Sequence, residues 1–420
     1  MYSSFMGHNK LVLENPAEKY PKFLKAAASS ETRNFDITKP IIFDMKAPSA
    51  EQELEKLVTT VKKLAIIDNY GEQYAELLLS RNAHLYRANY EVQLASIAEL
   101  LTEHYGSTQA WKMGVWVYFP WKNQLIHLLA QTDFEELRTI RNRDLITSQE
   151  QLKLHDATVV AFGMSVGSAG ALAVAITGMS RRMKLVDGAV ISGSNLNRIL
   201  TGVSSVGRSK AQVIAEQVYE MNPYSTITCF DKVGTDNIGE IFDEPWPVSV
   251  AVDEIDDIEM KVRIRFEARK RKIPVVMATE LGDTVMLDVE RFDLEPDRPL
   301  FHNLVPGIEE LLDNKLENYR EWTKRAVSII DPVNMPIKMQ KSLLKIGTTI
   351  VTHPQLGSTV MMTGGVLAFA IKNIVLGNPL KSGRYVIALE KEMLTDHQSR
   401  QYRRDHKKHT KVMQNALDAM

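Results

Sequence analysis

A glycine-containing turn is the first feature of the sequence that could do chemistry. The stretch GMSVGSAG, residues 163–170, follows an apolar run and precedes an alanine-rich run. Gly163 allows a tight turn and Gly167 lets a phosphate approach the backbone, while Ser168 opens a helix whose N-terminus favours negative charge. Ser165 stands where the usual G-x-G-x-x-G pattern has its second glycine. The stretch predicts a site for nucleotide phosphates.

An acidic residue follows this turn at the sequence spacing expected for a ribose contact. Asp187 ends the next apolar run, 24 residues after Gly163. An acidic side chain at about this distance accepts hydrogen bonds from a ribose hydroxyl. NAD and ATP both carry such a ribose, so these two features do not separate the two nucleotides.

The next motif, GSNLNR at residues 193–198, separates them. Asn195 and Asn197 offer amides, and Arg198 offers a planar cation suited to phosphate oxygens. Lys210 begins a later helical run and can reach the same phosphates. A hydride-transfer site does not need an arginine at the middle of its cofactor, whereas nucleotidyl transfer must stabilise charge on the phosphates. The motif therefore favours ATP and phosphate chemistry.

Carboxylates follow another apolar run, VSVAVDEIDD at 248–257. Asp253, Asp256 and Asp257 are expected at the carboxyl edge of a sheet, where ligands of such sheets bind. One or two carboxylates together with triphosphate oxygens make a Mg²⁺ site. The alternative is a solvated acidic turn, and we prefer the metal site because of the motifs that precede it.

The elements that would position these residues alternate between strands and helices from about 158 to 283. Their order predicts an α/β fold with a doubly wound, parallel, Rossmann-like sheet. The expected strands are TVVAFG, MKLVD, STITCF, VSVAVDE and IPVVMAT.

The domains are expected in chain order. Residues 1–133 form a mainly helical N-terminal region with a short helix near 17–29 and a buried strand at 116–121, and 134–390 form the nucleotide domain. Within that domain, 284–358 form an insertion that crosses the sheet edge. Residues 391–420 form a basic tail.

Composition restricts the class of protein. The chain of 420 residues has a formal net charge of −1, with 44% hydrophobic and 25% charged residues, as in soluble globular proteins. It shows no secretory signal pattern and no uninterrupted apolar run of membrane-spanning length, so we expect a cytoplasmic protein without a membrane partner. The single cysteine, Cys229, excludes an internal disulfide and a structural zinc site made of several cysteines.

Taken together, these motifs resemble the ThiF/MoeB-type adenylyltransferases, the superfamily of ubiquitin-activating enzymes. The resemblance covers roughly residues 138–390. It rests on the glycine turn, LVDGAVISGSNLNR, GRSK, VDEIDD and the later QLGSTVMMTGGVLAFAIKNIVLG. RTIRNR at 138–143 resembles a segment in which the family places an arginine finger that reaches a partner subunit.

The resemblance implies an activity and a set of roles. The chain would use ATP and Mg²⁺ to activate a carboxylate as an acyl-adenylate, and it would act as a homodimer. The implied roles are Asp187 for the ribose, Asn195, Arg198 and Lys210 for the phosphates, Asp256 for Mg²⁺, and Arg143 for the finger.

The sequence departs from the family pattern at several positions. Ala189 replaces an aspartate, Asp257 replaces an asparagine, and the paired cysteines of the family's zinc site are absent. No cysteine lies between 284 and 355, so the adenylate is not expected to pass to an internal thiol.

The acceptor stays open among a ubiquitin-like protein, a peptide, a small molecule and a tRNA-borne acid. The basic tail leaves RNA as an alternative partner, although a solvated helix is the preferred interpretation of that tail. Two other functions stay as alternatives: a non-catalytic nucleotide-binding scaffold and an NAD-dependent oxidoreductase.

Overall fold

The computed structural model describes residues 39–312 and 319–419. The described residues divide into two compact units, one within residues 152–215 and 226–419, and the other within residues 39–151 and 216–225. The short helix expected near 17–29 lies outside the described residues.

The first unit is built on a seven-stranded sheet with the order β11-β10-β9-β8-β5-β6-β7. Neighbouring strands from β7 to β9 run parallel, which confirms the doubly wound fold expected from the sequence. The order reverses at β5, so the carboxyl ends of β5 and β8 frame a switch point where ligands of such sheets bind. These five strands are β5 (Thr158–Phe162), β6 (Arg182–Val186), β7 (Thr226–Phe230), β8 (Val250–Asp253) and β9 (Val275–Glu280).

Beyond the parallel strands expected over about 158 to 283, the sheet continues with antiparallel strands. β10 (Thr284–Glu290) and β11 (Gly383–Ala388) extend it in antiparallel pairing beside β9. Only residues 281–283 separate β9 from β10, and a connection this short can join only antiparallel strands. The start of the segment expected to cross the sheet edge is therefore a strand of the sheet itself.

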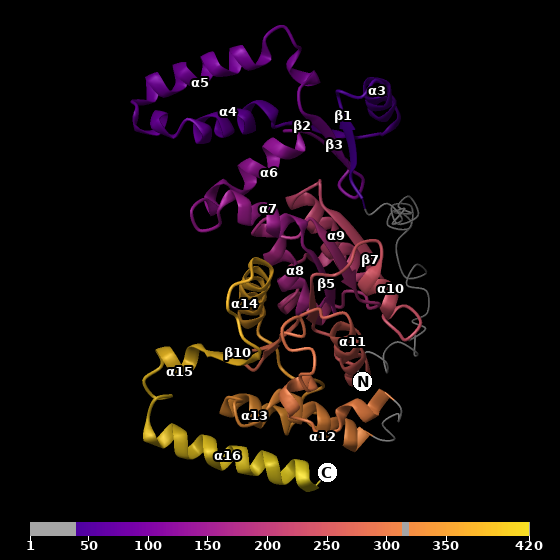
Figure 1. Ribbon diagram of the computed structural model, residues 1–420, viewed down its shortest axis with the longest axis vertical. Helices are drawn as coiled ribbons and strands as arrows, with labels where there is room; N and C mark the ends of the chain where they lie inside the picture. The colour runs from indigo at the N-terminus through magenta and orange to yellow at the C-terminus, as the bar shows by residue number, and fades with distance from the viewer. Residues whose placement is uncertain (1–38, 313–318, 420) are drawn as a thin grey trace, which may run out of the picture. The chain divides into compact units, whose positions relative to one another are not determined.

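Helices cover both faces of this sheet. Because parallel crossovers are right-handed, the reversal at β5 places α8 (Gly167–Ile176) and α11 (Ile258–Lys270) on opposite faces. The long helix α14 (Gly357–Leu376) lies along α8 (Figure 1). A Cβ added at Gly364 of α14 would come 2.6 Å from the Ala169 carbonyl oxygen, so the absent side chain allows the two helices to approach closely.

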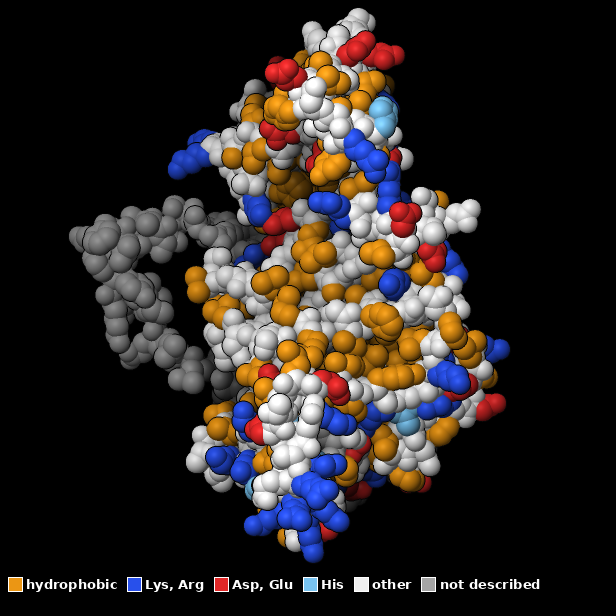
Figure 2. Space-filling view, turned by 90° about the vertical axis from the view of Figure 1, so that its left-hand side faces the viewer, with side chains coloured by type: hydrophobic (Ala, Val, Ile, Leu, Met, Phe, Trp, Pro, Cys, Tyr) orange, Lys and Arg blue, Asp and Glu red, His pale blue; other side chains and the backbone are white. Residues whose placement is uncertain are grey.

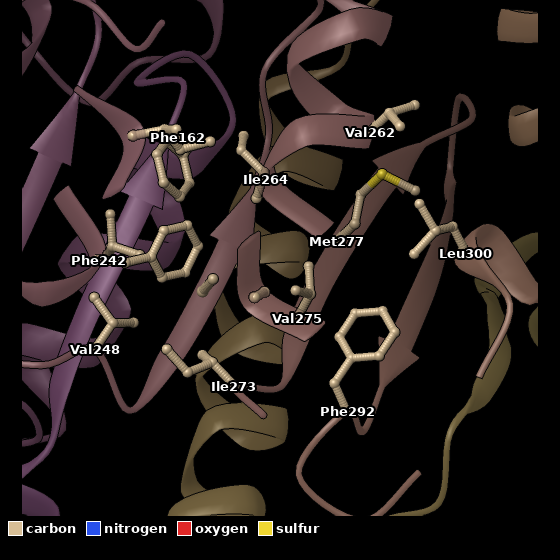
Figure 3. Close-up of a cluster of buried hydrophobic side chains, with 14 of the residues drawn as sticks. Phe162, Phe242, Val248, Val262, Ile264, Ile273, Val275, Met277, Phe292 and Leu300 are labelled. Carbon is tan, nitrogen blue, oxygen red and sulfur yellow. The ribbon is translucent and has the colours of Figure 1, made fainter. Parts of the chain in front are cut away.

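A large cluster of buried apolar residues lies between the sheet and α11, on the face that carries this helix. Phe162 of β5, Phe242 of α10 (Ile238–Asp243) and Phe292 bring aromatic rings into it, and Val275 and Met277 of β9 pack between the strands and α11 (Figure 3). Burial of this apolar surface anchors α11 on the sheet and so fixes the loop between β8 and α11.

Helix α14 is long and apolar enough to cross a membrane by length and composition, with half of the apolar window buried inside the protein. It packs against α8, β9 and β10. That packing gives its apolar composition a cause within the fold.

The remaining described elements of this unit follow the motifs along the chain. The short helices η5 (Gly193–Asn197) and η6 (Val203–Ser205) precede α9 (Lys210–Met221). The C-terminal part contains η7 (Leu300–Asn303), η8 (Ile308–Leu312), α12 (Tyr319–Ile330), α13 (Ile337–Leu343), α15 (Leu389–Met393) and α16 (Arg400–Ala419).

The second unit combines helices with a four-stranded sheet of order β1-β3-β4-β2. Helices predominate among its described residues, and β3 overlaps the strand expected at 116–121, whereas the other three strands were not predicted. They are only four or five residues long, and β1 and β2 are mostly exposed, so they lack a clear apolar alternation. The elements are β1 (Ile41–Asp44), α3 (Ala50–Thr60), β2 (Ala65–Asp68), α4 (Tyr70–Arg81), η2 (Ala83–Arg87), α5 (Tyr90–Tyr105), η3 (Ala110–Lys112), β3 (Val115–Phe119), β4 (Gln124–Leu128), α6 (Gln131–Thr139), η4 (Ile140–Asn142) and the start of α7 (Ser148–Asp156).

A buried ion cluster joins α11 to two strands of the main sheet. The fully buried Arg265 guanidinium donates to Asp253 at the end of β8, and its Nε lies 2.5 Å from Glu290 Oε2 at the end of β10. Lys261 adds a second cation 3.2 Å from Asp253. Burial disfavours the charged carboxylate, but Lys261 and Arg265 outweigh it and hold the pKa of Asp253 below its usual value.

Replacing Arg265 with methionine should destabilise the protein by about 3–5 kcal/mol, because two buried carboxylates would lose their shared partner. Urea unfolding followed by circular dichroism measures this loss. Arg263→Met on the same helix is the matched control. Arg263 pairs with the partly exposed Glu259 and makes a long 3.5 Å hydrogen bond to the Leu312 carbonyl, so its loss should cost less than about 1 kcal/mol. Equal losses for the two variants would contradict a special role for the buried cluster.

Candidate nucleotide site

The turn after β5 is held in a geometry that requires glycine. Gly163 has φ +87°, and its N–H donates to the Val186 carbonyl at 2.8 Å. An added Cβ would lie 2.4 Å from the Glu254 carbonyl oxygen. The turn is thus closed against the end of β8, and the amides at the start of α8 lie at the switch point of the sheet.

Asp187 holds this turn in place from the end of β6. Its Oδ2 accepts the Met164 N–H at 2.7 Å, and its Oδ1 accepts the Ala189 N–H at 2.7 Å. Lys210 Nζ lies 3.9 Å from Asp187 Oδ2, so the start of α9 brings a cation to the same place. Both side chains remain slightly exposed, Lys210 at 13% and Asp187 at 12%, so a ligand can reach them.

Arg198 is brought directly to the glycine turn. Its Nε donates to Ser165 Oγ at 3.0 Å, although 33 residues separate the two. The guanidinium also donates to the Ser194 carbonyl at 3.1 Å and to Asn197 Oδ1 at 2.9 Å. Burial lowers the pKa of Arg198, while Glu280 and Asp256 oppose that effect. Arginine stays protonated at neutral pH, so a cation lies beside the turn.

Three other residues predicted to contact the nucleotide make hydrogen bonds within the protein. Buried Asn195 caps η5, because its Oδ1 accepts the Ser192 N–H at 3.0 Å. Ser168 Oγ donates to the Ser165 carbonyl at 2.7 Å and tightens the first turn of α8. Asn197 Nδ2 donates to the Gln355 carbonyl at 2.9 Å. Gly167 lies buried at the start of α8.

The three aspartates after β8 have different environments. Asp256 is exposed, and it is close enough to Arg198 to influence that side chain's pKa. Asp257 caps α11 by accepting the Met260 N–H at 3.0 Å. Asp253 was expected to contact the nucleotide. In the structure it is instead fully buried and paired with Arg265 and Lys261. We therefore leave Asp253 out of the nucleotide contacts.

Two glutamates join the site that the sequence analysis did not single out. Burial raises the pKa of Glu254 well above its usual value, and its Oε1 accepts the Ala278 N–H at 2.7 Å. Glu280, at the end of β9, also has a raised pKa because of burial, and nearby Asp256 raises it further. Gln355 Nε2 donates to Glu280. In the sequence, Glu280 could have been recognised as a candidate site residue because it ends a buried strand.

Arg143 belongs to the other unit of the chain. Its guanidinium donates to Glu136 at 2.8 Å and to the Ser80 carbonyl at 3.3 Å, and its side chain is 48% exposed. Glu136 also pairs with Arg81 at 2.6 Å. Arg143 could therefore leave this pair without stranding a carboxylate.

The donors of the site fit a nucleotide with its metal better than a metal alone. Within residues 39–312 and 319–419, no group of three or more histidine, cysteine or carboxylate side chains is arranged to hold a metal ion. Asp256 is an exposed carboxylate beside Arg198. Mg²⁺ bound through one carboxylate commonly takes its other ligands from substrate phosphates and water.

Comparison with known proteins places this geometry in a family. The ThiF family pattern matches residues 137–411, which is well over half of the chain. An uncharacterized protein of Mycobacterium tuberculosis (strain CDC 1551 / Oshkosh) is 33% identical over 272 residues, 64% of this chain and 37% of its own length. The tRNA threonylcarbamoyladenosine dehydratase of Escherichia coli (strain K12) is 31% identical over 133 residues, 31% of this chain and 48% of its own. This chain thus spans about half or less of both relatives.

Solved structures are also similar, at low identity. PaaA matches with a TM-score of 0.45 at 16% identity, covering 62% of this chain and 80% of that one. The Escherichia coli tRNA N6-threonylcarbamoyladenosine dehydratase, solved with ATP, matches with a TM-score of 0.40 at 20% identity, covering 58% and 95%.

Proposed function

Because the chain belongs to the ThiF family, we propose that it is an ATP-dependent adenylyltransferase that activates a carboxylate and releases pyrophosphate. The observation that carries the proposal is the contact of Arg198 Nε with Ser165 Oγ at 3.0 Å, which holds a cation beside the phosphate turn. Hydride transfer does not require this cation, whereas attack on the α-phosphate develops charge that it can stabilise. We assign the activity to the domain expected over 134–390.

Each residue around the turn has a role in this proposal. The amides that open α8 bind phosphate oxygens, and Lys210 contributes a second cation beside Asp187. Each Asp187 oxygen accepts one backbone N–H, so each keeps a lone pair for a ribose hydroxyl. Asn195 supports the phosphate contacts indirectly, because its cap fixes the short helix that presents Arg198.

The reaction needs little proton transfer. An oxygen of the acceptor carboxylate attacks the α-phosphorus of ATP, and the bond from that phosphorus to the bridging oxygen of the β-phosphate breaks. The electron pair leaves with pyrophosphate. No general base is required because the attacking carboxylate is already ionised at neutral pH. Arg198 stabilises the charge that develops on the phosphate oxygens.

Asp256 would hold Mg²⁺ against the phosphates. Bound there, the ion would supply a Lewis acid for the phosphate oxygens. Asp256 is exposed, whereas Glu280 is 6% exposed and has a raised pKa. Of the two carboxylates, Asp256 is therefore the better ligand, and Glu280 acts with Gln355 to support the neighbouring wall.

The nucleophile that receives the activated acyl group is a separate molecule in this proposal, not a thiol of this chain. The sole cysteine, Cys229, lies in β7 with its Sγ 3.7 Å from the Ala211 carbonyl. β7 is the last strand in the sheet order, and β6 separates it from β5, so this thiol lies away from the glycine turn that follows β5. We propose that the carboxylate activated by ATP belongs to a peptide, a ubiquitin-like protein or a small acid.

The choice of nucleotide tests the proposal first. ATP with Mg²⁺ should raise the melting temperature, since a ligand at a hundred times its Kd stabilises by about 2.7 kcal/mol. NAD at the same concentration should give no shift, because no hydride-transfer site is proposed. Differential scanning fluorimetry measures both. A higher melting temperature with NAD and no change with ATP would overturn the proposed adenylation activity in favour of an oxidoreductase.

The metal role of Asp256 is tested by comparison with its neighbour. Asp256→Asn removes the proposed ligand charge and should lower ATP–pyrophosphate exchange at least about tenfold, or about 1.4 kcal/mol of transition-state stabilisation. Asp257→Asn is the control, because asparagine caps a helix as well as aspartate does. Unchanged exchange in Asp256→Asn would make this residue a turn residue only.

The arginine finger is tested by mixing subunits. Arg143→Ala and Arg198→Ala should each reduce exchange about a thousandfold, the scale of a finger that stabilises phosphoryl charge. After subunit exchange, the heterodimer holds one site with both arginines. An equal mixture should therefore recover roughly a quarter of wild-type activity, given symmetric pairing.

Arg141→Ala is the matched control for that experiment, since Arg141 is an exposed arginine of the same segment. It should keep its activity alone and in mixtures. A monomer at the assay concentration, or a mixture that stays inactive although labelled subunits have exchanged, would rule out a finger supplied by the partner.

A further inference from the structure

The C-terminal helix α16 carries a row of cations along one face. Arginine and lysine recur at spacings of three and four residues, which places them on one side of an α-helix. All of them are exposed, at positions 400, 403, 404, 407, 408 and 411. From the first to the last, the row extends about 16 Å along the helix axis. Lys and Arg side chains gather at the lower end of the molecule in Figure 2, the end at which α16 lies in Figure 1.

The other face of α16 is anchored on the protein. Met413 is buried in an apolar cluster with Met335 and Met339, the latter from α13. His406 Nε2 lies 2.7 Å from the Met335 carbonyl, and Gln340 Nε2 donates to Thr410 Oγ1 at 2.8 Å. The helix is therefore fixed in place, and its basic face is directed outward as a rigid surface.

The energetics of the helix do not account for this row. Like charges four residues apart repel, as do Arg403 with Lys407 and Arg404 with Lys408. Cations near the helix N-terminus also oppose the helix dipole, and no acidic residue lies in the first turn. Among the described residues, no ion pair joins a carboxylate to any of the six, and Asp405 hydrogen-bonds Gln401 instead.

We propose that this face of α16 binds the phosphate backbone of a nucleic acid. Regularly spaced cations on an exposed surface are the electrostatic footprint of phosphate binding. A protein partner is less suited to this face, because protein interfaces are depleted in lysine at their centres. A membrane is less suited because interfacial helices insert an apolar face, and the apolar face of α16 is already buried. The inference is independent of the adenylation proposed above.

The test uses the full chain without ATP and follows binding by fluorescence anisotropy. The probes are labelled 24-base-pair duplexes of RNA and of DNA with the same sequence, so their relative affinity identifies the source of the phosphates. The wild type should bind with micromolar affinity, and the logarithm of its association constant should fall with the logarithm of salt at a slope near about −5.

A neutralised variant carries the decisive comparison. It replaces four cations of the row by glutamine: Arg403→Gln, Arg404→Gln, Lys407→Gln and Lys408→Gln. Binding should weaken at least about tenfold and the salt slope should become shallower by about 3 to 4. Because glutamine keeps helix propensity and four repulsive charges are gone, the melting temperature should stay the same or rise. Unchanged ATP–pyrophosphate exchange would show that the fold and the nucleotide site are intact.

The matched control removes the same charge elsewhere on the surface, with Lys46→Gln, Lys56→Gln, Lys62→Gln and Lys270→Gln, all exposed in the structure. It should bind the duplexes as the wild type does. Equal weakening in the control, no binding of either duplex by the wild type at 50 mM salt, or tighter row-dependent binding to poly-glutamate or phosphatidylserine vesicles would overturn the proposal.

Discussion

Arg265 is enclosed by the protein and neutralises two buried carboxylates, Asp253 and Glu290. An unpaired charge in such a place would cost several kcal/mol, so the three groups must remain together in the folded state. Their positions fix α11, β8 and β10 to one another. Phe301 packs its ring 3.9 Å from the guanidinium and closes the cluster from the side.

The geometry of the nucleotide turn depends on that cluster. The residue after Asp253 is Glu254, whose carbonyl faces Gly163 so closely that no side chain fits there. Its carboxyl group accepts the Ala278 N–H of β9. The turn before α8 therefore packs against the end of β8, and the buried ion pairs of Arg265 fix the position of that strand end. A rigid cradle of this kind places phosphate donors before a ligand arrives, which reduces the ordering that binding requires.

Charges of both signs meet within the site, because Lys210 lies beside Asp187, and Asp256 is close enough to Arg198 to influence its pKa. Arg198 and Lys210 lie on the side of the turn and β6, whereas Asp256 and Glu280 lie at the ends of β8 and β9. Burial raises the pKa of the Glu254 and Glu280 carboxyl groups, because desolvation disfavours their charged forms. A polyphosphate with a cation would complement this arrangement, its anionic oxygens facing the arginine and lysine. The basic face of α16 is a different surface, built from consecutive helical turns.

The sequence alone determined the elements that local patterns specify. Apolar runs predicted the five parallel strands, and since the carboxyl ends of such strands meet at one edge, the glycine turn, Asp187 and Arg198 could be expected together. The basic row of α16 can also be predicted from the sequence, because the spacing of its cations matches the helical repeat.

Tertiary structure decided what depends on contacts between distant segments. Only packing enclosed Asp253, which has the same sequence signal as exposed Asp256, and only packing brought Gln355 to Glu280 across 75 residues. The short strands around β3 gain their hydrogen bonds from partners far along the chain, so no local period marks them. Burial and pairing belong to the assembled fold, and a chain position by itself does not contain them.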